Sequence, residues 1–291
     1  MASEDFRKLL ERMRARGRGG DVTLGEQRAL MEQLAALFPP PETVVFESAA
    51  AGSVPVEWAI PPAPEAGVLL YFHGGGYGMG SVATHRGLVG RLAAGARMRA
   101  LSVEYRLAPE HPYPAALEDA LAAYSWLRTR HAPQSIFLAG DSAGGGLVLA
   151  LLLALRSSNE PMPAGAVCMS PWTDMACTGA SMETRAEADP AVMAASLADF
   201  ARAYLNGAMP TTPLASPLYG DLTGLPPLLI LVGDAEILLD DSTRLAERAR
   251  AAGVDVTLEI WPEMIHIWPY FAPRLQEGRE AIARMAAFVR A

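Results

Sequence analysis

The chain has 291 residues, of which 51% are hydrophobic and 19% charged, and its formal net charge is −8. This composition predicts one large globular α/β domain and excludes a disordered chain, and the negative charge argues against nucleic acid or an anionic membrane as partner. No apolar run approaches the ~20 residues that a membrane span needs, and the N-terminus opens with charge rather than an apolar signal segment. Two isolated cysteines, Cys168 and Cys177, are typical of a reducing compartment, so we expect a cytoplasmic protein.

Residues 1–42 are predicted as N-terminal cap helices, because apolar residues recur at helical spacing from Phe6 to Leu37. A glycine-rich break at 17–20 divides them into two helices, and three consecutive prolines at 39–41 end the segment. Apolar residues then alternate with polar ones at 43–47 and 54–58, which predicts an antiparallel pair of strands.

From residue 67 onward, apolar runs alternate with amphipathic stretches. Strands are predicted at 68–72, 100–104, 135–139, 164–169, 227–232 and 254–260, and helices at 86–97, 114–130, 143–156, 241–252 and 274–290. This alternation indicates a mostly parallel sheet with helices on both faces and functional groups at the carboxyl ends of the strands. Residues 175–215 interrupt the alternation and are predicted as a helical cap insertion between two parts of the core, 43–174 and 216–291.

A candidate nucleophile lies between a predicted strand and a predicted helix. Ser142 is flanked by Gly140 and Gly144 in a G-x-S-x-G pattern. In that context the pattern indicates a nucleophile elbow, a sharp turn in which the glycines give the backbone room and the serine hydroxyl is lifted clear of the sheet. The turn also places the serine at a helix N-terminus, where free N–H groups favour developing negative charge.

Three glycines follow the predicted strand at 68–72 directly, in the run His73-Gly74-Gly75-Gly76-Tyr77. Glycine loses more backbone entropy on folding than any other residue, so the run implies that the backbone must come close to something. Upstream of a nucleophile elbow, such a loop supplies N–H donors to an oxyanion hole. We predict the N–H groups of Gly74, Gly75 and Ala143 as these donors, and His73 as an anchor of the loop.

The general base is expected last in the chain. Of the five histidines, only His266 lies downstream of Ser142, in the loop after the last predicted strand. The residue order therefore predicts His266 as the base.

The acid is expected in the loop after the strand at 227–232, where four carboxylates compete and spacing alone does not decide among them. Asp240 and Asp241 resemble the N-cap of the following helix, and Asp234 would turn at the strand end. Glu236 is placed where its side chain can reach back toward an imidazole.

Together these features resemble the hormone-sensitive-lipase family of bacterial esterases, which have the α/β-hydrolase fold. The likeness covers nearly the whole chain and rests on His73 to Gly76, Tyr105 to Ala116, Gly140 to Gly145, and 225–240. The family's acid is usually Asp followed by Pro-Leu, and the matching position is Glu236, followed by Ile237-Leu238. Glutamate can also orient the imidazole and stabilise its cation, so Glu236 is preferred, with Asp240 and Asp234 as alternatives.

The resemblance implies a serine carboxylesterase acting on small-molecule, short-chain acyl esters through an acyl-enzyme. No metal-ligand spacing, phosphate loop or dinucleotide fingerprint is present, so we expect no metal and no cofactor. Candidate pocket walls are the apolar and aromatic residues near the predicted loops, namely Tyr77, Trp172, Tyr204, Ile237, Ile267 and Trp268.

Two alternatives stay open. The same triad on this fold could hydrolyse an amide, carbamate or lactone, and the scaffold could serve as a non-enzymatic ligand-binding module, as in the plant gibberellin receptors. Those receptors lack the histidine base, so His266 argues against the second alternative. The edge expected at the last strand, 254–260, makes a homodimer plausible.

Overall fold

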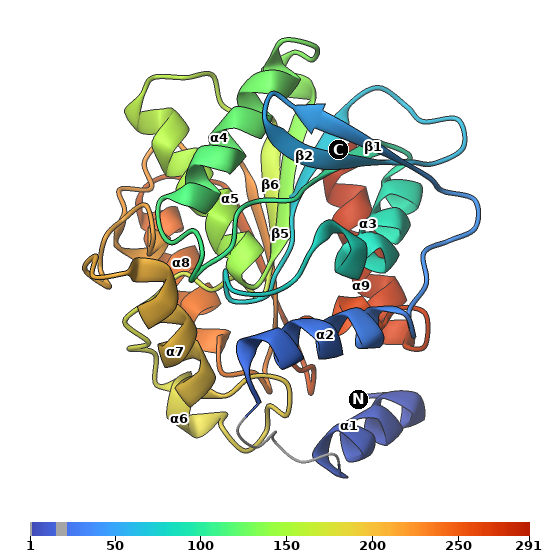
Figure 1. Cartoon of the computed structure of the whole chain (residues 1–291), viewed down its shortest axis with the longest axis vertical. Helices are drawn as coiled ribbons and strands as arrows, with labels where there is room; N and C mark the ends of the chain where they lie inside the picture. Colours follow the sequence, from blue (N-terminus) through green and yellow to red (C-terminus); the bar gives the residue numbers. More distant parts are fainter. Residues whose placement is uncertain (1, 16–21) are drawn as a thin grey trace.

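Eight strands form a single sheet in the order β1-β2-β4-β3-β5-β6-β7-β8 in the computed structural model, which describes residues 2–15 and 22–291 (Figure 1). The strands are β1 (Val45–Ala51), β2 (Val54–Ile60), β3 (Val68–Phe72), β4 (Arg99–Val103), β5 (Ile136–Asp141), β6 (Gly165–Met169), β7 (Leu228–Gly233) and β8 (Val256–Trp261). Strand β2 pairs antiparallel with β1 and β4, and all other pairs are parallel. The predicted mostly parallel sheet is confirmed, with each parallel strand within two residues of its predicted bounds.

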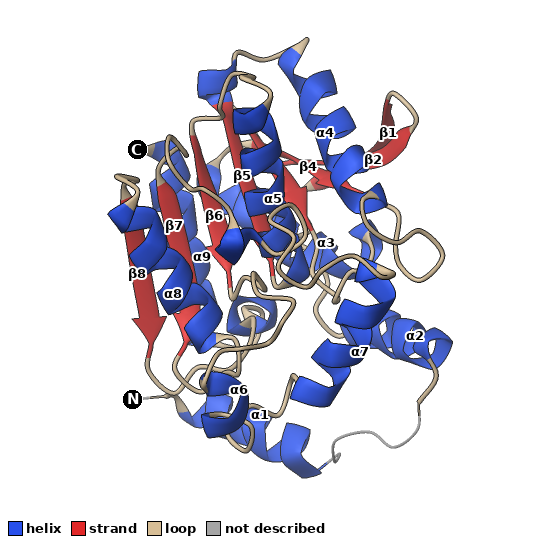
Figure 2. Cartoon of the chain, turned by 90° about the vertical axis from the view of Figure 1, so that its left-hand side faces the viewer, coloured by secondary structure: helices blue, strands red, loops and turns tan. Residues whose placement is uncertain are grey.

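Helices cover both faces of this sheet and the end of the molecule toward which its parallel strands point. They are α1 (Glu4–Ala15), α2 (Leu24–Ala35), α3 (Val82–Ala96), α4 (Ala115–Arg128), α5 (Ala143–Ser157), α6 (Ser181–Thr184), α7 (Ala194–Leu205), α8 (Leu239–Ala251) and α9 (Gln276–Arg290). Helices α4, α5 and α8 lie on one face, and α3 and α9 on the other (Figure 2).

The two faces explain why the central strands are apolar throughout. All five residues of β3 are buried; Val68, Leu70 and Phe72 enter the core under α5, while Leu69 and Tyr71 enter the core under α3 and α9. Successive side chains of a strand point to opposite faces, and both faces of a parallel sheet are covered. A continuous apolar run is therefore what such a strand requires.

Helices α3 and α8 start four and two residues earlier than predicted, and α4 and α9 start one and two residues later. Helix α3 begins four residues before the predicted position, because the Ser81 hydroxyl accepts the Thr84 N–H at 3.1 Å and caps the helix earlier. Helix α8 begins at Leu239 with no side-chain cap, so the predicted N-cap role of Asp240 and Asp241 is wrong; both lie in the first turn. Their carboxylates instead accept backbone N–H groups from outside the helix, those of Thr173 and Asp174 for Asp241 and that of Ser181 for Asp240.

The segment predicted as a cap, residues 175–215, holds α6 and α7. Together with α1 and α2, these helices lie at the end of the molecule toward which the parallel strands point (Figure 2). The glycine-rich break predicted at 17–20 lies outside the described residues. Within the described ranges, no helix is long and apolar enough to cross a membrane.

Candidate active site

The predicted site residues follow four parallel strands, β3, β5, β7 and β8, that lie close together in the sheet. The glycine loop follows β3, Ser142 follows β5, Glu236 lies after β7 and His266 after β8. Strand β6 separates β5 from β7, and its own following residue is Ser170. The carboxyl ends of these strands meet at one edge, so residues far apart in sequence converge there.

Ser142 occupies a sharp, strained turn. Its φ is 53° and its ψ −120°, a conformation that residues with a side chain adopt only where their surroundings impose it. The Ser142 N–H donates to the Met169 carbonyl at 2.8 Å, and the Ser142 carbonyl accepts the Trp172 N–H at 2.9 Å. The chain is thereby fixed on both sides of the hydroxyl.

The glycines of the elbow are required by close packing of backbone on backbone. A Cβ on Gly140 would lie 2.4 Å from the Gly144 carbonyl oxygen, and a Cβ on Gly144 only 2.0 Å from that of Phe72. No side chain fits at those distances. The glycine pattern read from the sequence thus has a steric cause in the contact between the elbow and β3.

His266 and Glu236 form a buried pair. The His266 Nδ1 lies 2.8 Å from Glu236 Oε2, and both side chains are at most 5% exposed. Burial lowers the pKa of His266, but the hydrogen bond to Glu236 and the charges of Glu236 and Asp189 outweigh it, so the pKa is raised. The contact requires a proton on Nδ1, because a carboxylate only accepts, and leaves Nε2 of the neutral ring able to accept a proton.

The other carboxylates of the acid loop have different partners. Asp234 accepts the Glu263 N–H at 2.7 Å, and Asp240 accepts the Ser181 N–H at 3.0 Å. Of the candidates weighed from the sequence, it is Glu236 that lies against His266.

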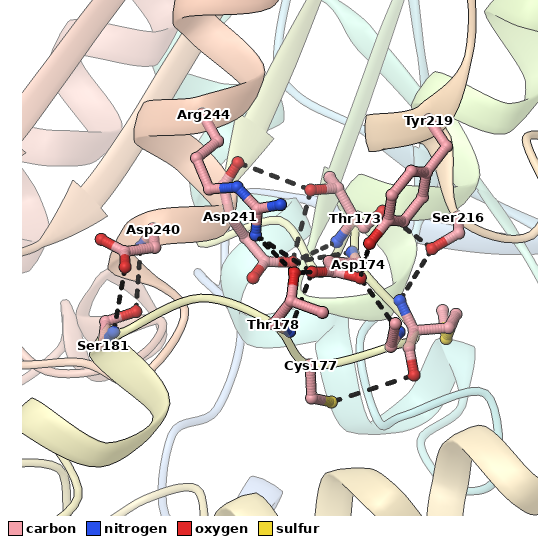
Figure 3. Close-up of polar contacts among 12 residues, drawn as sticks. Thr173, Asp174, Cys177, Thr178, Ser181, Ser216, Tyr219, Asp240, Asp241 and Arg244 are labelled. Carbon is pink, nitrogen blue, oxygen red and sulfur yellow. Dashed lines mark hydrogen bonds and ion pairs between the residues drawn. The ribbon is translucent and has the colours of Figure 1, made fainter. Parts of the chain in front are cut away.

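Asp241 belongs to a separate polar network that fixes the start of the cap segment (Figure 3). Its buried carboxylate accepts the N–H groups of Thr173 and Asp174 at 2.7 and 2.9 Å, and burial raises its pKa to about 7. Asp174 in turn is bound by Thr178, Tyr219 and Arg244. The first turn of α8 therefore holds the chain as it leaves β6 and enters the cap segment.

The glycine loop is held by Asp141, the residue before Ser142. Its carboxylate accepts the Gly74 N–H at 3.1 Å and the Tyr71 hydroxyl at 2.5 Å, and lies 3.3 Å from His85 Nε2. Burial raises the pKa of Asp141, but its partners outweigh this and the pKa is lowered. Asp141 was not among the predicted site residues, although its position inside the G-x-S-x-G pattern is a signal of its role.

The bond to Asp141 takes Gly74 out of the predicted set of oxyanion donors, because its N–H already has an acceptor. In the described part of the chain, the N–H groups of Gly75 and Gly76 have no such acceptor. Ala143 is the first residue of α5, so its N–H has no partner inside the helix.

His73 anchors the glycine loop, as predicted. Its Nδ1 lies 2.8 Å from the Gly74 carbonyl, which only accepts, so Nδ1 carries the proton. Burial lowers the pKa of His73 to about 3, which keeps the ring neutral, and the ring stacks on Tyr105.

Comparisons with known proteins show the family to which this chain belongs. A family model described as an alpha/beta hydrolase fold matches residues 69–270. The chain belongs to this family. An acetyl-hydrolase of Streptomyces hygroscopicus is 48% identical over 252 residues, which cover 86% of this chain and 83% of the relative. An esterase of Acinetobacter venetianus is 36% identical, with 90% and 87% of the two chains covered.

Solved structures extend the likeness to the whole hydrolase chain. A crystal structure of an esterase from the bacterial hormone-sensitive lipase family superimposes with a TM-score of 0.96 at 46% identity, covering 100% of this chain and 98% of that one. The esterase EstE5, soaked with p-nitrophenyl butyrate, gives a TM-score of 0.96 at 47% identity, with coverages of 99% and 98%. The resemblance to hormone-sensitive-lipase-family esterases is confirmed.

The predicted pocket walls of this α/β hydrolase fall into two groups. Tyr77, Trp172, Tyr204 and Ile237 are buried in the core on the α5 side. Trp268 is buried in the core on the opposite face, and Ile267 is half-buried against that same core. The two groups thus pack into different cores, although Ile237 and Ile267 directly follow the paired Glu236 and His266.

A residue missed from the sequence covers the glycine loop. Phe200 of α7 is half-buried, and a Cβ on Gly76 or on Gly78 would lie 2.8 Å from its ring. Beside it, the rings of Tyr77 and Tyr204 stack with centroids 3.8 Å apart. Helical spacing marks Phe200 as one apolar residue of a cap helix among several, so only the fold could select it.

A metal site would need a cluster of side chains that could bind an ion in the part of the chain that the structure describes. There, no group of three or more His, Cys, Asp or Glu side chains is arranged to hold an ion.

Proposed function

We propose that this α/β hydrolase is a serine carboxylesterase that hydrolyses short-chain acyl esters, with Ser142 as nucleophile, His266 as base and Glu236 as acid. The observation that carries the proposal is the buried 2.8 Å contact between His266 Nδ1 and Glu236 Oε2, on the loops that follow β8 and β7. The esterases and the acetyl-hydrolase among its relatives support the reaction class.

In the proposed reaction, His266 Nε2 takes the Ser142 proton as the hydroxyl oxygen attacks the ester carbonyl. The imidazolium that forms is stabilised by the Glu236 carboxylate, and its proton then passes to the leaving alcohol. The acyl-enzyme is hydrolysed by a water activated by the same histidine. The raised pKa of His266 suits a group that must become protonated during the first step.

The oxyanion donors are proposed as the N–H groups of Gly75, Gly76 and Ala143. Gly76 takes the place first assigned to Gly74, whose amide is bound to Asp141. Pre-formed donors of this kind are typically worth about 100-fold or more each in turnover. Asp141 supports this arrangement by fixing the loop from which two of the donors project.

A short acyl chain is supported by what surrounds the loop. Phe200 packs on Gly76 and Gly78, and Tyr77 of the loop stacks on Tyr204 of α7, so bulky aromatic rings fill space beside the glycines. Among the relatives, one is named an acetyl-hydrolase and one crystal was soaked with a butyrate ester. Ester hydrolysis is also favoured over ligand binding without catalysis, because binding alone does not require a histidine paired with a carboxylate.

The proposal is tested by hydrolysis of a p-nitrophenyl series from acetate to palmitate. We expect an optimum at acetate or butyrate, and a loss of roughly 10⁶-fold in turnover for Ser142→Ala. Ser157→Ala, at the far end of α5, is the matched control and should keep wild-type turnover. Full activity of Ser142→Ala would contradict the mechanism, and an optimum at palmitate would contradict the substrate class. Activity on an amide or lactone but not on the esters would favour the alternative linkage.

We also propose a homodimer formed through the free edge of β8. This strand ends the sheet, and Ile260 on it is 46% exposed, an apolar residue on an unpaired edge. Sedimentation velocity should show a dimer for the wild type and a monomer for Ile260→Lys. A wild-type monomer at micromolar concentration would contradict this proposal and leave the esterase mechanism unaffected.

A further inference from the structure

Ser170 lies between the acid and the base without belonging to the predicted triad. It follows β6, the strand between the strands of the nucleophile and the acid, and its side chain is fully buried. Its N–H donates to the Leu231 carbonyl at 2.7 Å, and its φ is +46°. A non-glycine residue in this left-handed region carries strain, which persists only where the surroundings impose it.

The Ser170 hydroxyl contacts both catalytic loops at once. Its Oγ lies 2.8 Å from Glu236 Oε1 and 3.2 Å from the Ile267 nitrogen. The carboxylate can only accept and the amide can only donate, so the hydroxyl proton must point to Glu236 and a lone pair to Ile267. One side chain thus joins the acid on the β7 loop to the residue that follows His266 on the β8 loop.

This contact divides the two oxygens of Glu236 between two tasks. Oε1 is held by the Ser170 hydroxyl and by the Gly233 N–H at 2.6 Å, while Oε2 faces His266 Nδ1 at 2.8 Å. With Oε1 fixed by two donors, rotation of the carboxylate away from the imidazole would break two buried hydrogen bonds. Buried polar groups that lose their partners are costly, so the orientation is enforced.

The same hydroxyl acts on the base from the other side. Ile267, directly after His266, has a φ of +46°, which is uncommon for a β-branched residue. The hydrogen bond from its N–H to Ser170 Oγ helps to hold this turn, and the turn sets where the His266 ring leaves the backbone.

We propose that Ser170 is a positioning residue that aligns the acid with the base, a role that rests on the proposed function of Glu236 and His266. It touches neither the substrate nor the reacting atoms, so it acts through Glu236. Loss of such outer hydrogen-bond partners typically lowers activity by about 10- to 100-fold where they orient metal ligands, and we expect a similar effect on this imidazole.

The first measurement is steady-state hydrolysis of p-nitrophenyl acetate by Ser170→Ala and Ser170→Gly. Both variants should lose about 10- to 100-fold in kcat with KM within about twofold of the wild type, because substrate binding is untouched. Glycine adopts φ +46° without strain, so Ser170→Gly keeps the test valid if the alanine variant folds poorly. Equal kcat losses in the two variants assign the effect to the hydroxyl.

Ser216→Ala is the matched control. Ser216 is equally buried, and its hydroxyl also makes two hydrogen bonds, here with backbone groups away from the loops of Glu236 and His266: the Met175 N–H at 2.7 Å and the Thr173 carbonyl at 3.2 Å. We expect a loss of thermal stability similar to that of Ser170→Ala but a kcat close to wild type. An equal fall in kcat for both variants would reduce Ser170 to a structural role and overturn the proposal.

A double-mutant cycle with Glu236→Ala decides whether the serine acts through the acid. If it does, adding Ser170→Ala to Glu236→Ala changes kcat by less than about threefold, whereas independent effects would multiply. Multiplying losses, or wild-type kcat in Ser170→Ala beside an inactive Glu236→Ala, would refute the positioning role alone. Wild-type kcat in Glu236→Ala would overturn the acid assignment itself, and the positioning role with it.

Discussion

Replacement of Glu236 by glutamine tests the acid with the least change of shape. The glutamine keeps the volume of the buried side chain, and its oxygen can still accept from Ser170 and from the Gly233 N–H. Its amide NH₂ then faces His266 Nδ1, which must become an acceptor, so the ring proton moves to Nε2. In that tautomer the imidazole cannot take the Ser142 proton. A wrong tautomer of this kind lowers kcat by about 10⁴-fold in serine proteases, or about 5 kcal/mol of transition-state free energy.

The assay is hydrolysis of p-nitrophenyl acetate at pH 8, with the thermal midpoint measured in parallel. We expect Glu236→Gln to fold with a midpoint within a few degrees of the wild type, and to lose about 10⁴-fold in kcat. Asp234→Asn and Asp240→Asn are matched controls, because each carboxylate binds a backbone N–H instead of the imidazole. Loss of activity in either control with full activity in Glu236→Gln would refute the reasoning.

Three further predictions concern the pH dependence of the reaction and two glycines. The pKa of His266 lies above its ordinary 6.5, and the proposed base acts only when neutral. The kcat/KM of the wild type should therefore rise with pH and reach half its maximum above pH 6.5. Glu236→Gln lacks the carboxylate charge that raises the pKa of His266, so its residual activity should persist to lower pH. A pH profile of both proteins tests this, and an unshifted acidic limb would contradict it. Gly144→Ala should destabilise the fold by about 3 kcal/mol or more, because its Cβ would lie 2.0 Å from the Phe72 carbonyl oxygen in a rigid strand. Gly25→Ala, in helix α2 with open space around it, should instead stabilise by about 0.5–1 kcal/mol in urea unfolding.

The sheet and its helices were predictable because their signals are local. A run such as Val68 to Phe72 is apolar at every position, which only a strand covered on both faces requires. The elbow glycines were equally legible, since close backbone contact excludes any side chain there. The helix starts were harder to predict from the sequence. The Ser81 side chain caps α3 at its N-terminus, whereas Asp240 and Asp241 occupy positions that resemble an N-cap but do not cap α8.

The choice among the acid-loop carboxylates was not available from the sequence. Asp234, Glu236 and Asp240 lie within seven residues of one another, and which of them meets His266 depends on how the loops after β7 and β8 pack. That packing is set by contacts such as the Ala235 N–H to the Met264 carbonyl at 3.1 Å, between residues distant in the chain.

By itself, the sequence determined the layered α/β architecture and pointed to Ser142 and His266 as candidate nucleophile and base, because periodicity, glycine patterns and chain order are properties of neighbouring residues. Only the tertiary structure decided that Gly74 is bound by Asp141, that Phe200 covers the glycine loop and that Ser170 joins Glu236 to Ile267. Each of these contacts joins residues more than 60 positions apart. Their meeting depends on strand order and loop packing, which no local pattern encodes.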